Sequence, residues 1–263
     1  MGFPPARQRR KKVIEPMVRE RIRIRFSKTG NLCFIGHRDL LTTLERLFRR
    51  SRLPIAMSQG FHPKLRMSFP SALPLGVAGE DEVFELELSE TMEPDFVLES
   101  LNRCSVDGLR FLSATVLAPG EKNTLLHSSL YEVNIPSEFR QSVQKKIESF
   151  LSSETFPIEK HNGKTVDLRP AVLSLDFDSE TGPLTVELLT TQGPDAGIRE
   201  FLKALGLDDE IFRSVFPVRK KCMLQKETAE DRRQTAEKNS VNCRLPSDVF
   251  PPHSAGKEVS QTA

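Results

Sequence analysis

The sequence predicts an α+β fold of two tandem ferredoxin-like (split βαβ) units with antiparallel sheets. Some segments alternate with a two-residue period, which is typical of strands, and others carry apolar stripes at three- and four-residue steps, which are typical of helices. Their order in the first half is strand, helix, strand pair, helix, strand, and the second half repeats this plan more weakly. We expect unit 1 over residues 18–120 and unit 2 over residues 127–224, flanked by a disordered basic arm (1–17) and a disordered tail (225–263).

The first strand and the first helix of unit 1 have the clearest patterns. Residues 18–26 alternate between apolar residues and arginines. After this strand and a turn, residues 31–35 form a second, short apolar segment. Residues 37–52 carry a stripe of leucines and one phenylalanine at helical spacing, and Pro54 blocks continuation of the helix.

The other elements follow the same two periodicities. In unit 1 we expect a loop (58–63), a strand (65–70), a Pro/Gly-broken connection (71–81), an alternating strand (82–88), a helix (93–102) and a strand (108–117). In unit 2 we expect a strand (130–136), a helix (137–151) with Ser137 as N-cap, strands (156–160, 164–177, 183–190), a helix (195–207) and a final strand (211–224).

Composition and cysteine spacing exclude several classes. No stretch approaches the ~18–20 uncharged apolar residues of a membrane span, and the N-terminus has no apolar core of a secretory signal. We therefore expect a cytoplasmic protein without membrane contact. Cys33, Cys104, Cys222 and Cys243 are too far apart in sequence for a zinc ribbon or an iron–sulfur loop, so we expect no metal and no cofactor.

Charge is strongly segregated along the chain. Residues 1–70 contain 17 Lys and Arg against 4 Asp and Glu, whereas residues 71–108 contain 1 against 10. The net charge of +2 therefore hides a basic first quarter beside an acidic band. This asymmetry indicates either a polyanionic partner or pairing within the chain.

An arginine row on the first strand allows both interpretations. Its members share one side of the strand: Arg19, Arg21, Arg23 and Arg25. On an open sheet face the row would contact an RNA backbone. Alternatively, because the first and third strands of a ferredoxin-like sheet are neighbours, Glu85 and Glu87 could pair with the row, or the row could pack against unit 2.

Further candidate RNA contacts cluster at the end of the first helix and in the loop after it. They are Arg46, Arg49, Arg50, Gln59, Phe61, His62, Lys64 and Arg66. The loop could hold a phosphate, or a base against its phenylalanine. It could equally be a rigid turn whose phenylalanine lies in the core.

His37 lies at a strand-to-helix junction, where an imidazole can act as a general base or bind phosphate. Capping or local packing is the alternative. Asp39 fits a helix acid of the first turn better than a catalytic partner.

Three motifs resemble the radical-SAM-linked protein family, a domain of unknown function found alone or fused to radical-SAM proteins with a cobalamin-binding-type domain. They are Phe34-Ile35-Gly36-His37-Arg38-Asp39-Leu40, Ser58-Gln59-Gly60-Phe61-His62-Pro63 and Leu73-Pro74-Leu75-Gly76-Val77. A more distant similarity is to CRISPR repeat-processing endoribonucleases, which implies His37 as a general base. The C-terminal glycine-rich loop of those enzymes is missing from this sequence.

The resemblance implies an accessory protein beside a separate radical-SAM enzyme, acting on tRNA or other RNA without DNA specificity. Two alternatives stay open. One is a metal-independent endoribonuclease that uses His37, and the other is a protein-interaction scaffold whose arginines and glutamates pair with one another.

Overall fold

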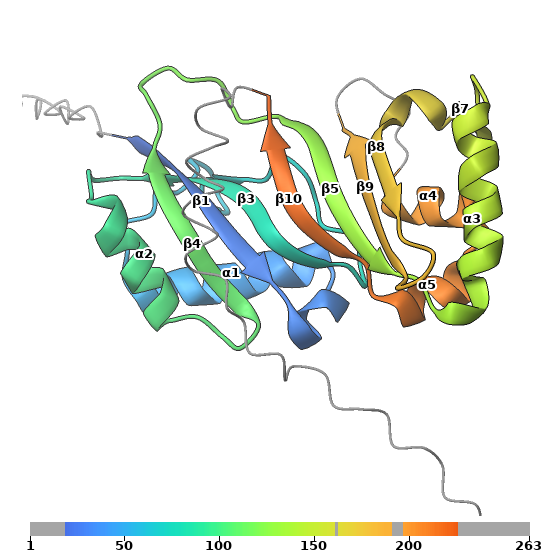
Figure 1. Cartoon of the computed structure of the whole chain (residues 1–263). Helices are drawn as coiled ribbons and strands as arrows, with labels where there is room; N and C mark the ends of the chain where they lie inside the picture. Colours follow the sequence, from blue (N-terminus) through green and yellow to red (C-terminus); the bar gives the residue numbers. More distant parts are fainter. Residues whose placement is uncertain (1–18, 161–162, 191–196, 226–263) are drawn as a thin grey trace, which may run out of the picture. The chain divides into compact units, whose positions relative to one another are not determined.

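The computed structural model describes residues 19–160, 163–190 and 197–225. The predicted arm (1–17) and the predicted tail after its first residue lie outside this part of the chain. The described residues form an α+β fold in which helices pack on a mainly antiparallel sheet, as predicted (Figure 1). None of the described helices is long and apolar enough to cross a membrane.

Helices and strands are interspersed along both halves of the chain. The first half contains β1 (Glu20–Lys28), the 3-10 helix η1 (Gly30–Phe34), α1 (His37–Ser51), β2 (Met67–Ser68), β3 (Ala78–Leu88), α2 (Pro94–Arg103) and β4 (Leu109–Val116). The second half contains β5 (Leu126–Asn134), α3 (Ser137–Ser152), β6 (Pro157–Glu159), β7 (Thr165–Asp167), the 3-10 helix η2 (Arg169–Ala171), β8 (Val172–Phe177), β9 (Pro183–Leu189), α4 (Ile198–Ala204), α5 (Asp209–Val215) and β10 (Val218–Leu224).

Strands of both halves join one sheet in the order β4-β1-β3-β10-β5-β9-β8, and β2 pairs with β3 beside this path. The short strands β6 and β7 pair with each other in a separate sheet. All pairings in the larger sheet are antiparallel except that of β3 with β10. That parallel contact is short: Val218 lies opposite Ala78, and Arg219 lies opposite Gly79. The last strand of the second half therefore joins the two halves.

The first core lies between the β1-β3-β4 part of the sheet and the two helices α1 and α2 (Figure 1). Helix α1 buries its predicted stripe, including Leu40, Leu44 and Leu47, against Ile24 of β1 and its strand neighbours. The helix ends where Arg52 adopts a left-handed conformation (φ 57°), two residues before Pro54. Burial of the stripe is the main source of the helix's stability in water.

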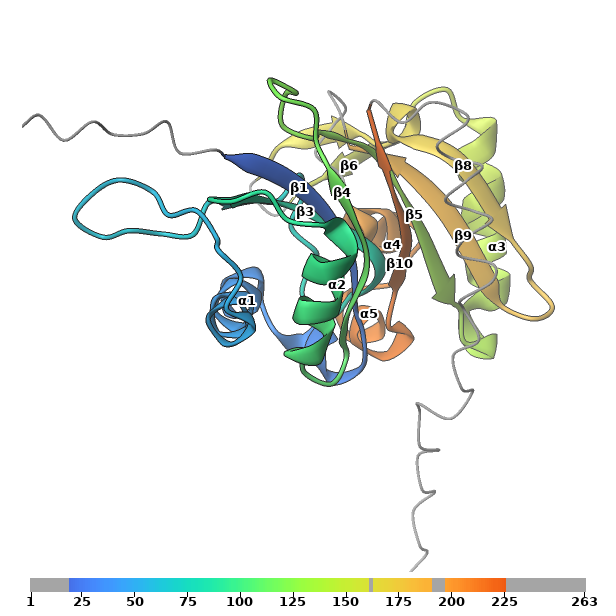
Figure 2. The same ribbon diagram turned by 90° about the vertical axis from the view of Figure 1, so that its left-hand side faces the viewer.

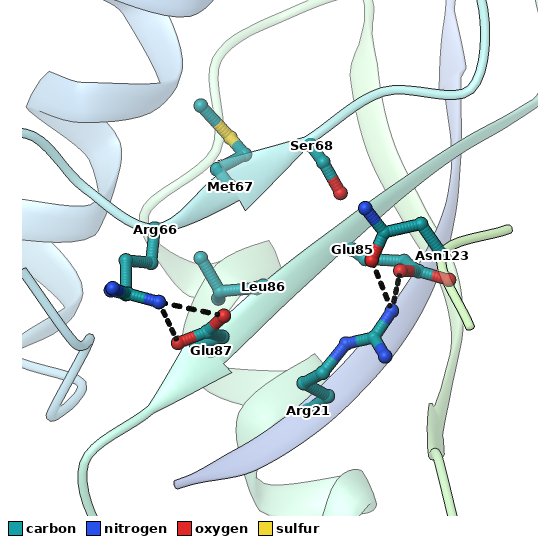
Figure 3. Close-up of a pocket in the computed structure, with 8 residues that line it drawn as sticks. All are labelled: Arg21, Arg66, Met67, Ser68, Glu85, Leu86, Glu87 and Asn123. Atoms are coloured by element: carbon teal, nitrogen blue, oxygen red, sulfur yellow. Dashed lines mark hydrogen bonds and ion pairs between the residues drawn. The ribbon is translucent and has the colours of Figure 1, made fainter. Parts of the chain in front are cut away.

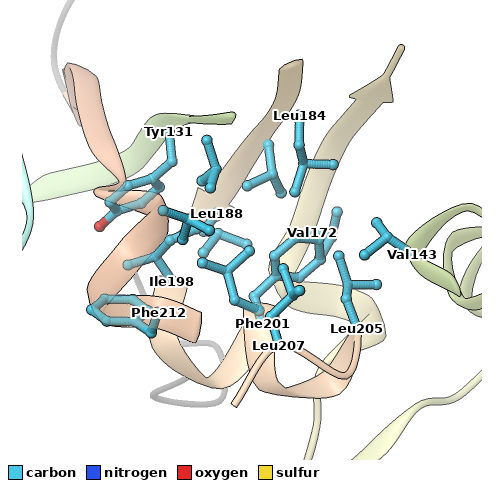
Figure 4. Packing of buried hydrophobic residues seen from close by; sticks show 14 of the residues in the cluster. Tyr131, Val143, Val172, Leu184, Leu188, Ile198, Phe201, Leu205, Leu207 and Phe212 are labelled. Atoms are coloured by element: carbon cyan, nitrogen blue, oxygen red, sulfur yellow. The ribbon is translucent and has the colours of Figure 1, made fainter. Parts of the chain in front are cut away.

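The second core belongs to the second half. Leu184 and Leu188 of β9 pack with Val143 of α3 and with Phe201 and Phe212 of the C-terminal helices (Figure 4). A third, smaller cluster contacts the opposite face of β3 and consists of Val83, Leu126, Cys222 and Leu224.

Several sequence predictions need correction. The strand expected over 164–177 is divided into β7 and β8 by η2, and β3 begins at Ala78, inside the expected connection 71–81. Residues 31–35 lie largely in η1 instead of an extended piece, and the strand predicted at 65–70 is reduced to Met67–Ser68. Ser137 is the first helical residue of α3, because Pro136 takes the N-cap position without a side-chain cap. The segment expected as one strand over 211–224 contains α5 before β10.

Candidate nucleic-acid interface

The arginine row lies on the face of β1 that points away from α1 and α2. Alternation buries Ile22, Ile24 and Phe26 among the helices and turns the arginines to the opposite face. Arg19 precedes the strand and is exposed.

Arg21 and Arg23 are held by a carboxylate of the neighbouring strand and by the segment between β4 and β5. Strand pairing sets Arg23 opposite Glu85, and both arginines form ion pairs with that carboxylate. Thr124 accepts hydrogen bonds from Arg23 at 2.6 and 3.0 Å, and Glu121 lies 3.4 Å from Arg23 Nη2. Figure 3 shows Arg21 pointing toward Glu85.

Arg25 is also paired inside the chain. Its Nη1 donates to Asp81 Oδ2 at 2.6 Å and to the Cys222 carbonyl oxygen of β10 at 3.4 Å. The arginine row was expected either to face RNA or to pair within the chain, and Arg21, Arg23 and Arg25 pair within the chain. These three guanidiniums lack the free positive charge that an RNA backbone contact needs.

The pKa of Glu85 reflects this pairing. Burial alone would raise the pKa of its carboxyl group, because the charged form loses water. Hydrogen bonds from Thr124 and Arg21, together with the charges of Arg21 and Arg23, outweigh burial and hold the pKa below its usual value. Glu85 is therefore ionised in the folded protein at neutral pH.

Glu87, the second carboxylate expected beside the row, pairs elsewhere. Arg66 donates to both of its oxygens, at 3.0 and 3.2 Å (Figure 3). A recess of about 180 Å³ lies between these two ion pairs and is lined by Arg21, Arg66, Ser68, Glu85 and Glu87 among others. Because its charged groups already neutralise one another, the recess offers little net charge to a ligand.

The arginines of α1 are arranged differently. Arg46 and Arg49 are exposed, and neither takes part in an ion pair with any described residue. Arg50 is exposed and donates to the Cys104 carbonyl oxygen at 2.7 Å. Arg38 was not among the predicted RNA contacts, but it is also exposed. It lies on the same side of α1 as Arg46 and Arg49, which follow it by eight and eleven residues along the helix.

The predicted loop after α1 is a hairpin over residues 56–66. Met57 bridges Leu65, and the Ser58 N–H donates to the Lys64 carbonyl oxygen at 2.7 Å. The segment between α1 and β2 extends away from the sheet in Figure 2. Its exposed side chains include the predicted site residues Gln59, Phe61, His62 and Lys64.

His37 is the first residue of α1 and is partly buried. Its ring packs edge-on against Phe69, with ring centroids 5.1 Å apart. Within the described residues, the contact of its imidazole is this aromatic packing, and no carboxylate forms an ion pair or hydrogen bond with it. Among the described residues no group of three or more His, Cys, Asp or Glu side chains could hold a metal ion.

Comparison of the sequence with known protein families identifies a bacterial family. No curated protein matches the chain. One family model, described as an uncharacterized protein conserved in bacteria (DUF2344), matches residues 21–199, which include β1 after its first residue, α1, the 56–66 hairpin and β3. The chain therefore belongs to this bacterial family.

Proposed function

We propose that the protein is a non-catalytic RNA-binding accessory protein that contacts the backbone of tRNA-like RNA through the exposed arginines of α1. The observation that carries the proposal is the free positive charge of this helix. Arg38, Arg46 and Arg49 lie eight and three residues apart along one face, so each can meet a different phosphate. Arg50 and Arg52 extend the charge to the end of the helix.

Half of the acidic band, the five carboxylates of β3, is paired within the fold and does not neutralise this face. The acidic residues of β3 each pair with a basic residue: Glu80 with Lys220, Asp81 with Arg25, Glu82 with Arg219, Glu85 with Arg21 and Arg23, and Glu87 with Arg66. Within the described part of the basic first quarter, β1 is therefore paired internally, whereas Arg38, Arg46 and Arg49 of α1 form no ion pair with a described residue. Phosphate binding belongs to the helix.

The proposal includes a separate radical-SAM enzyme as partner, and it assigns a ferredoxin-like fold to each half of the protein. The motifs around His37, His62 and Gly76 support the partner through their resemblance to the radical-SAM-linked family. The strand orders β4-β1-β3-β2 and β10-β5-β9-β8 support the ferredoxin-like fold of the two halves, since each order is that of the split βαβ plan.

A binding titration with a structured tRNA-like RNA at low salt tests the proposal. Arg46→Glu with Arg49→Glu should abolish most of the affinity of the wild-type chain. Lys145→Glu with Lys146→Glu makes the same charge change on α3 and should bind nearly as wild type. No retention of RNA by the wild-type chain at ~50 mM salt would end the proposal.

A cleavage assay with the same RNA tests the endoribonuclease alternative. RNA incubated with the wild-type chain and with His37→Ala should stay intact in both. Cleavage by wild type and not by the variant would replace the accessory role with catalysis at His37.

One observation favours the scaffold alternative as a second candidate. The paired arginines of β1 and glutamates of β3 are what that hypothesis expects. A chain that binds no RNA but co-purifies with a radical-SAM enzyme would establish it.

A further inference from the structure

We infer that Phe61 is a base-stacking residue at the tip of the 56–66 hairpin, which makes the RNA interface select unpaired bases over duplex. This inference rests on the proposed RNA-binding function and names the class of RNA. It starts from one measurement: the side chain of Phe61 is 102% exposed, more than that of any other large apolar residue in the described part of the chain. The ring therefore contributes nothing to the core.

The hairpin holds this ring away from the sheet on a bonded frame. The Arg66 N–H donates to the Ala56 carbonyl oxygen at 2.9 Å, and the Lys64 N–H donates to Ser58 Oγ at 2.9 Å. Pro63 restricts the backbone next to the tip. A projecting aromatic on such a frame loses little conformational entropy when it meets a ligand.

The base of the hairpin is tied to β3. The Ala56 N–H donates to the Glu87 carbonyl oxygen at 2.8 Å, and the Glu87 N–H donates to the Arg66 carbonyl oxygen at 3.0 Å. The Arg66–Glu87 ion pair joins the same two segments through their side chains. Arg66, a predicted RNA contact, thus also holds the hairpin against β3.

The charge around Phe61 favours nucleic acid over protein as the ligand. Residues 46–79 contain no Asp or Glu, and Lys64 is exposed three residues from the ring. Protein–protein contacts centred on an aromatic residue are depleted of charge at their core. Surfaces that bind single strands instead combine aromatic rings with cations that follow the backbone.

The exposed neighbours complete a site for a base. His62 offers a second ring, and the amide of Gln59 can both donate to and accept from a base edge. Within a duplex both faces of each base are covered by its neighbours. Only a base in a loop, a bulge or a single strand can stack on Phe61.

The inference is tested with two RNAs of equal length and phosphate number, a stem–loop and a blunt duplex. The wild-type chain should prefer the stem–loop. Phe61→Ala should weaken stem–loop binding by roughly 5- to 150-fold, the range expected for loss of one stacked base, and leave duplex binding unchanged. Phe61→Tyr should keep the preference, whereas Phe61→Leu, which is apolar without a flat ring, should lose most of it.

Two controls sharpen the result. Phe96, a 52% exposed phenylalanine of α2, is the matched control, and Phe96→Ala should bind both RNAs as wild type. Replacing the loop nucleotides of the RNA with abasic sites should reproduce the loss, and Phe61→Ala should then cause no further loss.

The outcomes separate the inference from the proposed function. Equal wild-type affinity for both RNAs, or an unchanged preference in Phe61→Ala, overturns the stacking role and leaves the hairpin to a protein partner, while RNA binding itself stands. Failure of the wild-type chain to bind either RNA overturns the proposed function and the inference together.

Discussion

Arg219 and Glu82 form an ion pair in the protein interior, with side chains only 2% and 4% exposed. Arg219 Nε donates to Glu82 Oε1 at 2.7 Å, and Arg219 Nη2 makes a second contact with Oε2. A Cβ atom at Gly79 would lie 2.5 Å from Glu82 Oε1, so only glycine leaves room for the pair. We expect Arg219→Met to lower the free energy of unfolding by about 3–5 kcal/mol in urea titrations, because Glu82 would stay buried without its partner.

A double variant that removes both charges checks this prediction. Arg219→Met combined with Glu82→Leu removes both charges and should recover much of the stability, since no charge is left buried alone. If the loss in the free energy of unfolding of the double variant equals the sum of the losses of the two single variants, Arg219 and Glu82 do not stabilise each other.

Glu85 gives a pH-dependent prediction. Its pKa in the folded protein lies below the ordinary value of 4.5, so its contribution to stability is full above that pH and is lost as the pH falls through the lower, folded value. Glu85→Gln should therefore make the free energy of unfolding less dependent on pH below about 4.5. Glu154→Gln, at an exposed glutamate, should leave the wild-type pH dependence in place.

Between elements, the β1–β3 pairing is the contact that the charge pattern predicts best. Arg23→Glu and Glu85→Arg should each lower stability by more than an exposed charge change does, since both groups are largely withdrawn from water (20% and 4% exposed side chains). The double exchange should recover part of the loss in a double-mutant cycle. Strictly additive losses would mean that the two side chains do not interact.

Several elements follow directly from local sequence patterns, whereas others depend on distant contacts. Alternation predicts β1 and β3, including which residues face the helices, and the apolar stripe predicts α1 within a residue or two. The segment holding Glu121 and Thr124 carries no periodic signal, yet it supplies partners for Arg21 and Arg23. Its position depends on the path from β4 to β5, which local patterns do not contain.

The candidate site shows the same division. The sequence identifies the basic residues of α1 and the 56–66 hairpin, but it leaves open whether Phe61 is buried or exposed. That question depends on whether the hairpin folds back on the sheet, which only tertiary structure decides. For the arginine row, strand neighbourhood predicts Glu85 as a partner, whereas Asp81 and Glu121 emerge only from the structure.

In the protein as a whole, β10 links the two halves. Arg219 on β10 binds Glu82 of the first half and lies opposite Tyr131 of the second half. Burial raises the pKa of the Tyr131 phenol, and the nearby Arg219 only partly offsets this increase. The chain contains no Trp and one Tyr, so tyrosine fluorescence reports on the second half alone. Urea unfolding followed by this signal and by circular dichroism should give coincident midpoints. Separate midpoints would show that the halves unfold independently.

The salt dependence of RNA binding tests the assignment of the interface to α1 most directly. Each phosphate contact contributes about 0.7–0.9 to the slope of log affinity against log salt concentration. Arg46→Glu with Arg49→Glu should therefore reduce the slope of the wild-type chain by at least about 1.4–1.8, while Lys145→Glu with Lys146→Glu leaves it unchanged. Equal slopes for wild type and the α1 variant would place the RNA elsewhere on the protein and contradict the account.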